Sequence, residues 1–245
     1  MNILLAPAES KSTGGEEASF NINNFFLEAN FDKRKEVLDL YETHVENLSH
    51  EELSSWFSLK KMSEVVRYKE SLLHKVGKKA ILRYTGVAFD AIAYESLNKE
   101  AQNYIDENVI IFSNLFGPIK AKDIIPDYKF KQGAKLPSFN LEKHYLEHFS
   151  KSLDACLDDE IIDLRAGYYE KFYKCTNKKV LCFKFLKDGK VISHWAKHYR
   201  GILLNVLSKN NIQSFSEFMH LNIPGLEVIE IEEKKNVKTM IMRII

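Results

Sequence analysis

Apolar residues in the first third of the chain recur every three or four positions, which is the spacing of amphipathic helices. Val37 and Val45 would share the buried face of a helix over about 32–48. A capping-box pattern that begins at Ser49 then predicts a second helix, and a third helical stretch follows to about residue 73. Residues 32–74 are therefore predicted to form a helical subregion.

Continuous apolar runs predict buried strands at 2–6, 109–117 and 160–167. The stretch KAILRYTG, residues 79–86, alternates apolar and polar positions and also predicts a strand. Residues 87–97 could form a helix that packs back against the preceding strand. Residues 79–117 are therefore expected to form a strand, helix, strand unit.

A long loop region is expected at 118–137, where proline and glycine leave room for short strands at most. Asn140 is placed to cap a helix that continues to about residue 157. Farther along, Asp188-Gly189 separates two alternating runs, which predicts a β-hairpin.

The C-terminal part continues with a helix over about 196–208, a short helix capped at Ser214, and strands at 226–232 and 237–244. The chain contains no internal repeat and no linker-like break. We therefore predict one α/β (mixed α+β) domain over 1–245, with a central mixed β-sheet flanked by helices. The pattern does not determine the order of the strands.

The composition, 45% apolar and 28% charged, is that of an ordinary globular protein. No apolar run approaches the roughly 18 residues of a membrane span, and the N-terminus lacks the features of a signal peptide, so a cytoplasmic location without membrane contact is expected. Neither a cofactor nor an oligomeric state is indicated. The cysteines form no C-x-x-C motif and are expected to be reduced, buried thiols: Cys156, Cys175 and Cys182.

Charge is segregated along the chain although the net charge is only +1. Residues 1–59 hold four basic and eleven acidic residues, whereas 60–83 hold eight basic and two acidic, and 168–200 hold nine basic and two acidic. Lysines commonly coat solvated surfaces, but two dense basic blocks are also what a phosphate-binding surface needs. An anionic partner is therefore one of two open interpretations.

Polar or glycine-containing turns follow several of the predicted strands. Ligands of open α/β sheets bind in the crevice at the carboxyl ends of the strands, so we expect these turns to share an anion-binding cleft. Any single turn could instead be only a tight connection. The residues expected in this cleft are Lys11, Tyr84, Gly86, Gly117, Asp163, Tyr168 and Gly201.

The stretch HWAKHYRG suggests two kinds of chemistry. His194 and His198 have a spacing that could hold a metal, but Trp195 stands where the zinc hydrolase motif needs glutamate, and no metal site is predicted. Lys197 and Arg200 lie near the start of a predicted helix, where unpaired amides and the helix dipole favour an anion. The following glycine permits close approach of either a ligand or another backbone.

Five segments resemble, in order, those of the YaaA family of bacterial peroxide stress proteins, and together they span nearly the whole chain. They are APAESK (6–11), RYTG (83–86), SNLFGPIKAKDIIPDYKFKQG (113–133), IIDLRAGYYEKF (161–172) and AKHYRG (196–201). The resemblance implies a cytosolic protein with a mixed α/β fold that protects cells from hydrogen peroxide by keeping unincorporated iron low.

The resemblance also implies binding of double-stranded or distorted DNA through a helix-hairpin-helix-like element and a basic cleft. By position the element would lie at 48–73, where the turn FSLKKMSE has no glycine and side-chain cations are expected to contact phosphates. The DNA-binding residues would be Lys60, Lys61, Arg67, Lys69, Lys171, Lys174, Lys197 and Arg200.

Two other functions are compatible with the sequence. An enzyme could act on a small anionic substrate held by Lys11, Lys197 and Arg200, with Asp163, Tyr84 or Tyr168 near the reacting atom, although no nucleophile and base can be named and the catalytic residues are unknown. Direct chelation of iron is less favoured, because no His, Asp, Glu and Cys cluster stands out.

Overall fold

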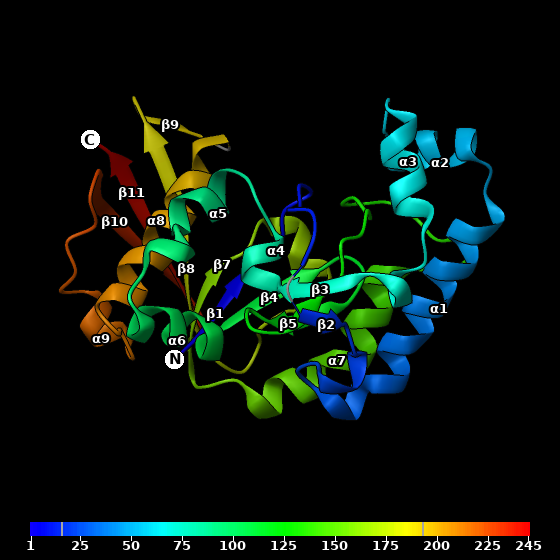
Figure 1. The fold of residues 1–245 in the computed structure, drawn as a ribbon. Helices are drawn as coiled ribbons and strands as arrows, with labels where there is room; N and C mark the ends of the chain where they lie inside the picture. Colours follow the sequence, from blue (N-terminus) through cyan, green and yellow to red (C-terminus); the bar gives the residue numbers. More distant parts are fainter. Residues whose placement is uncertain (16, 193) are drawn as a thin grey trace.

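A mixed β-sheet runs through the computed structural model, which describes residues 1–15, 17–192 and 194–245, without the side chains of 17–19 and 194. The termini and the two ends of the sheet can be followed in Figure 1. Among the described residues the strands lie in the order β10 (Leu226–Lys234), β11 (Val237–Ile244), β8 (Lys179–Lys187), β7 (Glu160–Leu164), β1 (Asn2–Leu5), β4 (Val109–Ser113) and β5 (Gly117–Lys120), with β9 (Lys190–Val191) beside β8. The predicted fold class is confirmed.

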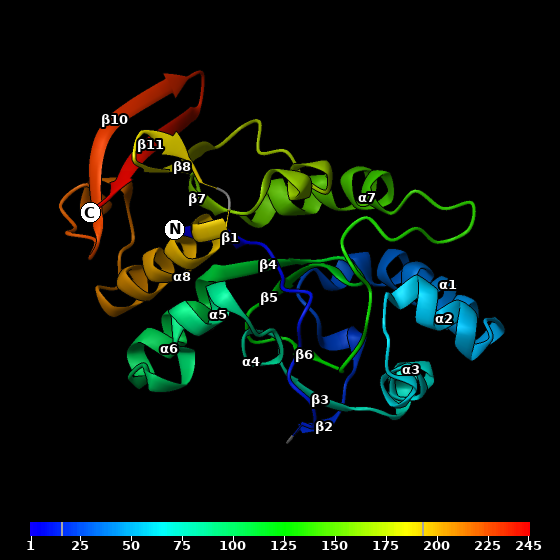
Figure 2. The ribbon, with the colours of Figure 1, turned by 90° about the horizontal axis from the view of Figure 1, so that it is seen from above.

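The centre of the sheet is parallel and buried. β1 pairs in parallel with both β4 and β7, and Ile3, Leu4 and Leu5 are at most 1% exposed. Such continuous apolar strands are typical of parallel sheets that are covered on both faces. Figure 2 shows helix α7 (Leu141–Cys156) on one face of β4 and helices α5 (Val87–Ile92), α6 (Lys99–Asn108) and α8 (His194–Lys209) on the other.

The predicted helical subregion consists of α1 (Phe31–Asn47), α2 (His50–Phe57) and α3 (Met62–Lys69). Val37 and Val45 face the core as expected, and both halves of the capping box at Ser49 are formed. The third helix ends four residues earlier than predicted and is followed by a short 3₁₀ turn, Leu72–His74.

The strand predicted at 79–86 is wrong. Strand β3 (Val76–Lys79) ends there, and one helical turn, α4 (Ala80–Arg83), follows. The reason is Arg83, whose guanidinium is fully buried and donates to the backbone carbonyls of Ser12 and Gly14. The apolar and polar alternation reflects a buried arginine on a helical turn, not a strand.

The expected strand, helix, strand unit is therefore absent from residues 79–117. β3 instead pairs with β2 (Glu17–Ser19) and with β6 (Ile124–Ile125), in a small sheet separate from the main one. Helix α5 packs instead against α8, where Ala88 and Ala91 approach Gly201. The long region 118–137 holds only short strands, as predicted.

The C-terminal elements follow the prediction closely. Lys187 pairs with Lys190 across the Asp188-Gly189 turn, and Ser214 caps α9 (Phe215–Phe218). Helix α8 begins at His194, two residues before the predicted start. Within the described residues, no helix combines the length and the apolar character that crossing a membrane requires.

The expectation of buried cysteines is wrong. All three thiols are unpaired, but Cys156 is exposed and Cys175 and Cys182 are only partly buried. The apolar spacing of α7 ends near Cys156, so its side chain lies beyond the buried face. Partial burial still raises the pKa of Cys182 to about 12 and favours the unreactive thiol.

Candidate functional site

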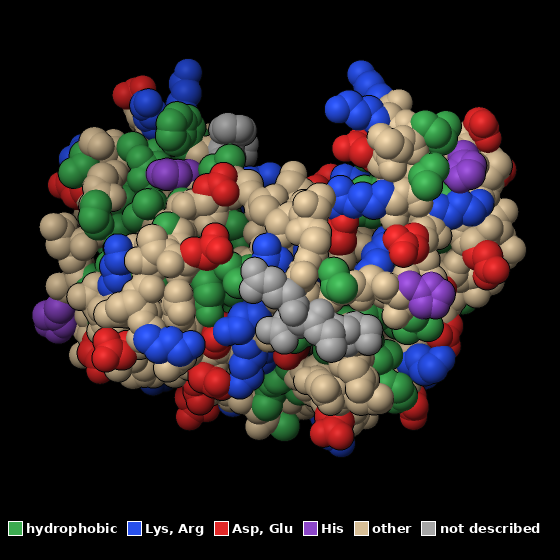
Figure 3. Space-filling model, in the orientation of Figure 1, with side chains coloured by type: hydrophobic (Ala, Val, Ile, Leu, Met, Phe, Trp, Pro, Cys, Tyr) green, Lys and Arg blue, Asp and Glu red, His purple; other side chains and the backbone are tan. Residues whose placement is uncertain are grey.

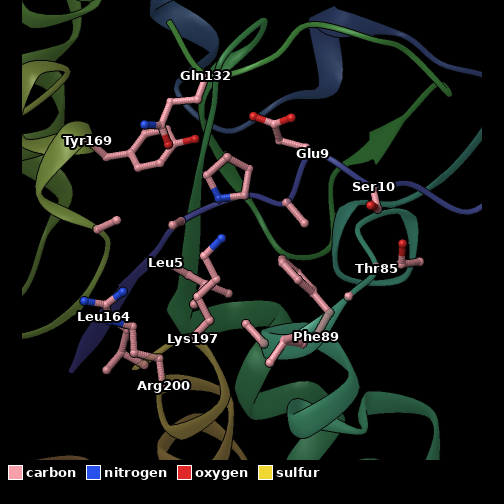
Figure 4. A pocket seen from close by; sticks show the side chains of 17 residues that line it. Leu5, Glu9, Ser10, Thr85, Phe89, Gln132, Leu164, Tyr169, Lys197 and Arg200 are labelled. Atoms are coloured by element: carbon pink, nitrogen blue, oxygen red, sulfur yellow. The ribbon is translucent and has the colours of Figure 1, made fainter. Parts of the chain in front are cut away.

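A cavity of about 420 Å³ opens where β1 and β7 end. Leu5 and Leu164, the last residues of these two strands, form its floor, and Phe89 of α5 forms a wall. Because parallel strands end at the same edge of the sheet, segments far apart in sequence meet here. Figure 4 shows Lys197 and Arg200 reaching the cavity from α8 on one side, with Glu9 and Gln132 on the opposite side.

Gly201 places the two cations of α8. A Cβ atom at this position would lie 2.2 Å from the Ala88 carbonyl oxygen and 2.7 Å from the Ala91 Cβ. Helices α5 and α8 therefore cross in close contact at Gly201, and Arg200 comes one residue before the crossing point. Of the two interpretations of Gly201, close approach of another backbone is the one observed.

Arg200 carries a positive charge that has no hydrogen-bond or ion-pair partner among the described residues. Its guanidinium makes no hydrogen bond or ion pair with the rest of the described chain, although burial lowers the pKa of this side chain. The nearby carboxylate of Asp163 partly offsets that effect. Lys197 is exposed at the same rim, so the cavity combines two cations with an apolar floor.

Asp163 is not available as an acid or base in the cavity. Its carboxylate accepts two hydrogen bonds from Arg165, at 2.9 Å from Nε and 2.7 Å from Nη2, and also accepts the backbone N–H of Arg165. Arg165 itself is buried and donates to the carbonyls of Tyr169 and Tyr173. The predicted Asp163 therefore holds the turn after β7 in place.

Tyr168 does not line the cavity. Its hydroxyl donates to Glu142 at 2.7 Å and accepts the Gly133 N–H at 3.0 Å. The neighbouring Tyr169 lines the cavity instead. The predicted Tyr168 is thus replaced by its neighbour, because the sequence pattern does not determine on which side of the turn each ring lies.

Glu9, Gln132 and Thr85 also line the cavity and were missed as site residues. All three belong to the motif segments 6–11, 83–86 and 113–133, which was a signal that could have identified them. Within its long segment, nothing distinguishes Gln132 from the other polar loop residues. Gly86, which was predicted, lines the cavity with a φ of +98°.

Lys11 lies beside this cavity, over two tyrosine rings. Its Nζ is 4.1 Å from the centroid of Tyr128 and 5.3 Å from that of Tyr84, and the two hydroxyls are 2.7 Å apart. Burial and the neighbouring Lys129 lower the pKa of Lys11 to about 7. Gly117, by contrast, lies outside the cavity and makes room for the Tyr145 ring.

The basic block at 60–83 is only partly available to a ligand. Arg67 forms an ion pair with the buried Asp127, and Lys69 donates to the Leu48 carbonyl at 2.6 Å. Of the four cations predicted in this block, Lys60 and Lys61 are exposed, whereas Arg67 and Lys69 are half-buried and bonded within the protein.

Helices α2 and α3 form a compact helical pair. The turn between them begins at Ser58, which adopts the left-handed conformation, with a φ of 56°, that glycine usually supplies in such turns. Lys61 precedes α3 and no side chain of the described residues caps this helix. The first amides of α3 are thus presented next to two lysines, a combination that favours an anion.

The loop at 126–137 connects the helical pair to the cavity. Lys131 donates to the Ser58 hydroxyl at 2.5 Å, and Trp56 donates to the Lys135 carbonyl at 3.3 Å. Gln132, next to Lys131, reaches the cavity. The α2–α3 turn and the cavity therefore lie along one continuous surface.

This surface is a saddle between two lobes. We call α2 and α3 the helical lobe, and β8, β9, α5 and the first turns of α8 the sheet lobe. Figure 3 shows the molecule hollowed between them, with lysine or arginine side chains at the tips of both. Lys187 of β8 and Lys190 of β9 are exposed, as are Lys60 and Lys61 in the turn before α3. Figure 1 shows β9 and α3 on opposite sides of the saddle.

The two remaining predicted cations, Lys171 and Lys174, also lie outside the cavity. Lys171 and Lys174 are exposed, and the amine of Lys171 lies 5.0 Å from the centroid of the Tyr168 ring. Within residues 1–15, 17–192 and 194–245, no three His, Cys, Asp or Glu side chains are grouped so as to hold a metal ion. The side chain of His194 lies outside the described part of the chain, so the spacing of the two histidines is not tested.

Comparison with known proteins identifies the family to which this chain belongs. The family model described as "Peroxide stress protein YaaA" matches residues 1–232. This chain belongs to the YaaA family. The family is that of peroxide stress proteins, and the resemblance drawn from the five motif segments is confirmed.

Relatives of the YaaA family align over most of the chain. An uncharacterized protein of Campylobacter jejuni is 44% identical over 100% of both chains. UPF0246 proteins of Corynebacterium efficiens and Corynebacterium glutamicum are 32% and 29% identical, over 85% and 97% of both chains.

All five segments that carried the YaaA resemblance contribute residues to the cavity wall or to the structure that supports it. Four of them, together with Gln132 of the fifth, line the cavity. The family resemblance and the geometry therefore point to the same edge of the sheet.

Proposed function

We propose that this protein is a peroxide stress protein that binds double-stranded or distorted DNA across the saddle, largely through the phosphate backbone. In this role it limits iron-dependent damage to DNA. The observation that carries the proposal is that cations occur on both sides of a hollow: the exposed Lys60 and Lys61 directly before α3 of the helical lobe, and the exposed Lys197 and half-buried Arg200 of α8 at the cavity. Figure 3 shows the hollow between the two lobes. Phosphate contacts of this kind provide affinity without reading base sequence.

The α2–α3 turn supports the same proposal. An uncapped helix N-terminus beside two lysines can accept a phosphate through backbone amides, and Ser58 provides the turn geometry without a glycine. The internal bonds of Arg67 and Lys69 remove them from the proposed contacts and give them a structural role.

The proposal predicts the effect of removing the cations of α8. The double variant Lys197→Gln/Arg200→Gln should bind duplex DNA about 10-fold to 100-fold more weakly, by the same factor for unrelated sequences. Mobility-shift titrations at several salt concentrations should show wild-type affinity falling steeply with salt, and a slope reduced by about 2 in the variant.

The matched control is Lys122→Gln/Lys143→Gln. Both lysines are exposed and pair with carboxylates, Glu107 and Glu147, and α7, which carries Lys143, lies away from the saddle. This variant loses the same charge and should keep the wild-type affinity and slope. Equal weakening in the two double variants, or a wild-type affinity that is independent of salt, would reject the saddle as the binding surface.

We further propose that protection does not require the protein to chelate iron. Equilibrium dialysis of the purified protein with ferrous iron should show no stoichiometric binding in the micromolar range, where oxygen and nitrogen clusters would bind. Tight binding of one iron per chain would instead make chelation the protective chemistry.

A further inference from the structure

We infer that the cavity at the ends of β1 and β7 holds a single nucleotide, with its phosphate at Lys197 and Arg200 and its base against the apolar floor. This inference rests on the proposed function, because DNA bound across the saddle would bring a nucleotide to the cavity mouth. The nucleotide has two possible sources, a residue turned out of bound DNA or a free mononucleotide.

The size and the walls of the cavity fit a nucleobase. A volume of about 420 Å³ lies in the usual range of small-ligand sites, roughly 300–1,000 Å³. Leu5, Pro7 and Leu164 provide apolar surface, and the Phe89 and Tyr169 rings contribute aromatic walls. Flat apolar and aromatic surfaces of this kind are what extrahelical bases contact in proteins that turn them out of a duplex.

The rim of the cavity fits a phosphate. Arg200 has no partner in the described chain, and its planar guanidinium can bind two phosphate oxygens at once. Lys197, one helical turn earlier, adds a second cation on the same face of α8. Anchored by Gly201 against α5, these side chains are held at a defined position relative to the floor.

The opposite side of the cavity presents groups that can bind the edge of a base. The exposed carboxylate of Glu9 accepts hydrogen bonds, and the amide of Gln132 both donates and accepts them. A site with a cationic rim, an apolar floor and a polar far side matches the phosphate, the ring face and the polar edge of the base of a nucleotide.

Binding of free nucleotides tests the site itself. Isothermal titration calorimetry with each of the four 2′-deoxynucleoside 5′-monophosphates should show saturable binding of one molecule per chain. Arg200→Gln should weaken it about 10-fold because a charged hydrogen bond is lost, and Glu9→Gln should weaken it for at least one base. Ala8→Leu, whose larger side chain would occupy part of the cavity, should abolish it, and thermal unfolding of each variant checks that the fold is kept.

Binding within DNA is tested with a duplex that carries 2-aminopurine opposite a mismatched base. A base that leaves the stack should raise the emission when wild-type protein is added, and Ala8→Leu should lose that rise while still shifting the duplex in a gel. A rise in emission identifies DNA as a source, and titration heat without such a rise identifies the free mononucleotide.

The inference fails if wild-type protein shows neither heat with millimolar nucleotides nor a change in emission. It also fails if Ala8→Leu and Glu9→Gln, both folded, leave these signals unchanged. A gel shift that persists under either outcome leaves DNA binding across the saddle intact, whereas loss of the gel shift alone contradicts the proposed function and not the nucleotide site.

Discussion

Lys11 is a cation held over aromatic rings, an environment that its place in a polar motif does not suggest. It lies on the faces of Tyr84 and Tyr128 without an ion pair among the described residues, and its closest hydrogen-bond acceptors are the carbonyls of Ala8 and Glu9 at 3.4 Å. Contact with the rings only partly compensates the amine for lost water. The charged form of Lys11 is therefore less stable in the folded protein than in water.

The lowered pKa of Lys11 predicts a specific pH dependence of stability. Between about pH 7, its pKa in the fold, and 10.5, its ordinary pKa, the unfolded chain binds more protons than the folded one, so the free energy of unfolding rises with pH. Lys11→Met should remove this rise and stabilise the protein at pH 6 relative to pH 9.5, by at least about 1 kcal/mol.

Urea denaturation at the two pH values measures this difference. Lys143→Met, at an exposed lysine of α7, is the control and should show the same small effect at both. An unchanged pH dependence in Lys11→Met would mean that the amine is solvated in the folded protein.

At the scale of elements, the crossing of α5 and α8 positions the cations of the site. Gly201→Ala would force the helices apart, because the new methyl group would overlap the Ala88 carbonyl. We expect a loss of about 1–3 kcal/mol in the free energy of unfolding, together with weaker DNA binding because Lys197 and Arg200 shift.

The control for this prediction is Gly167→Ala. Gly167 has no positive φ, and the nearest atom to an added Cβ would be a Glu170 carboxylate oxygen 3.9 Å away. Its free energy of unfolding should change by less than about 0.5 kcal/mol. If Gly201→Ala is equally mild, the two helices are not held by close contact.

At the scale of the whole molecule, the saddle joins cations from distant parts of the chain. If one duplex spans both lobes, adding Lys60→Gln/Lys61→Gln to Lys197→Gln/Arg200→Gln should lower the salt slope by about 2 more. The decrease should occur with one binding event, which titration calorimetry with a short duplex can count. Two independent events, each sensitive to one pair, would show that the lobes bind separately.

The sequence alone was sufficient for elements whose formation depends on nearby residues. The capping box at Ser49, the apolar face of α1 and the Asp188-Gly189 turn are stabilised by contacts that periodicity and turn chemistry describe. The motif segments also sufficed to place the chain in its family.

The tertiary structure alone decided which side chains are available for chemistry. Asp163 and Arg67 are neutralised by Arg165 and Asp127, and Arg83 turns a predicted strand into a helix by binding backbone carbonyls. These partners are brought together by folding, and their strength depends on burial, which no local pattern encodes. For the same reason the sequence identified the edge of the sheet where the cavity forms, but only some of the residues that line it, among them Gly86, Lys197 and Arg200.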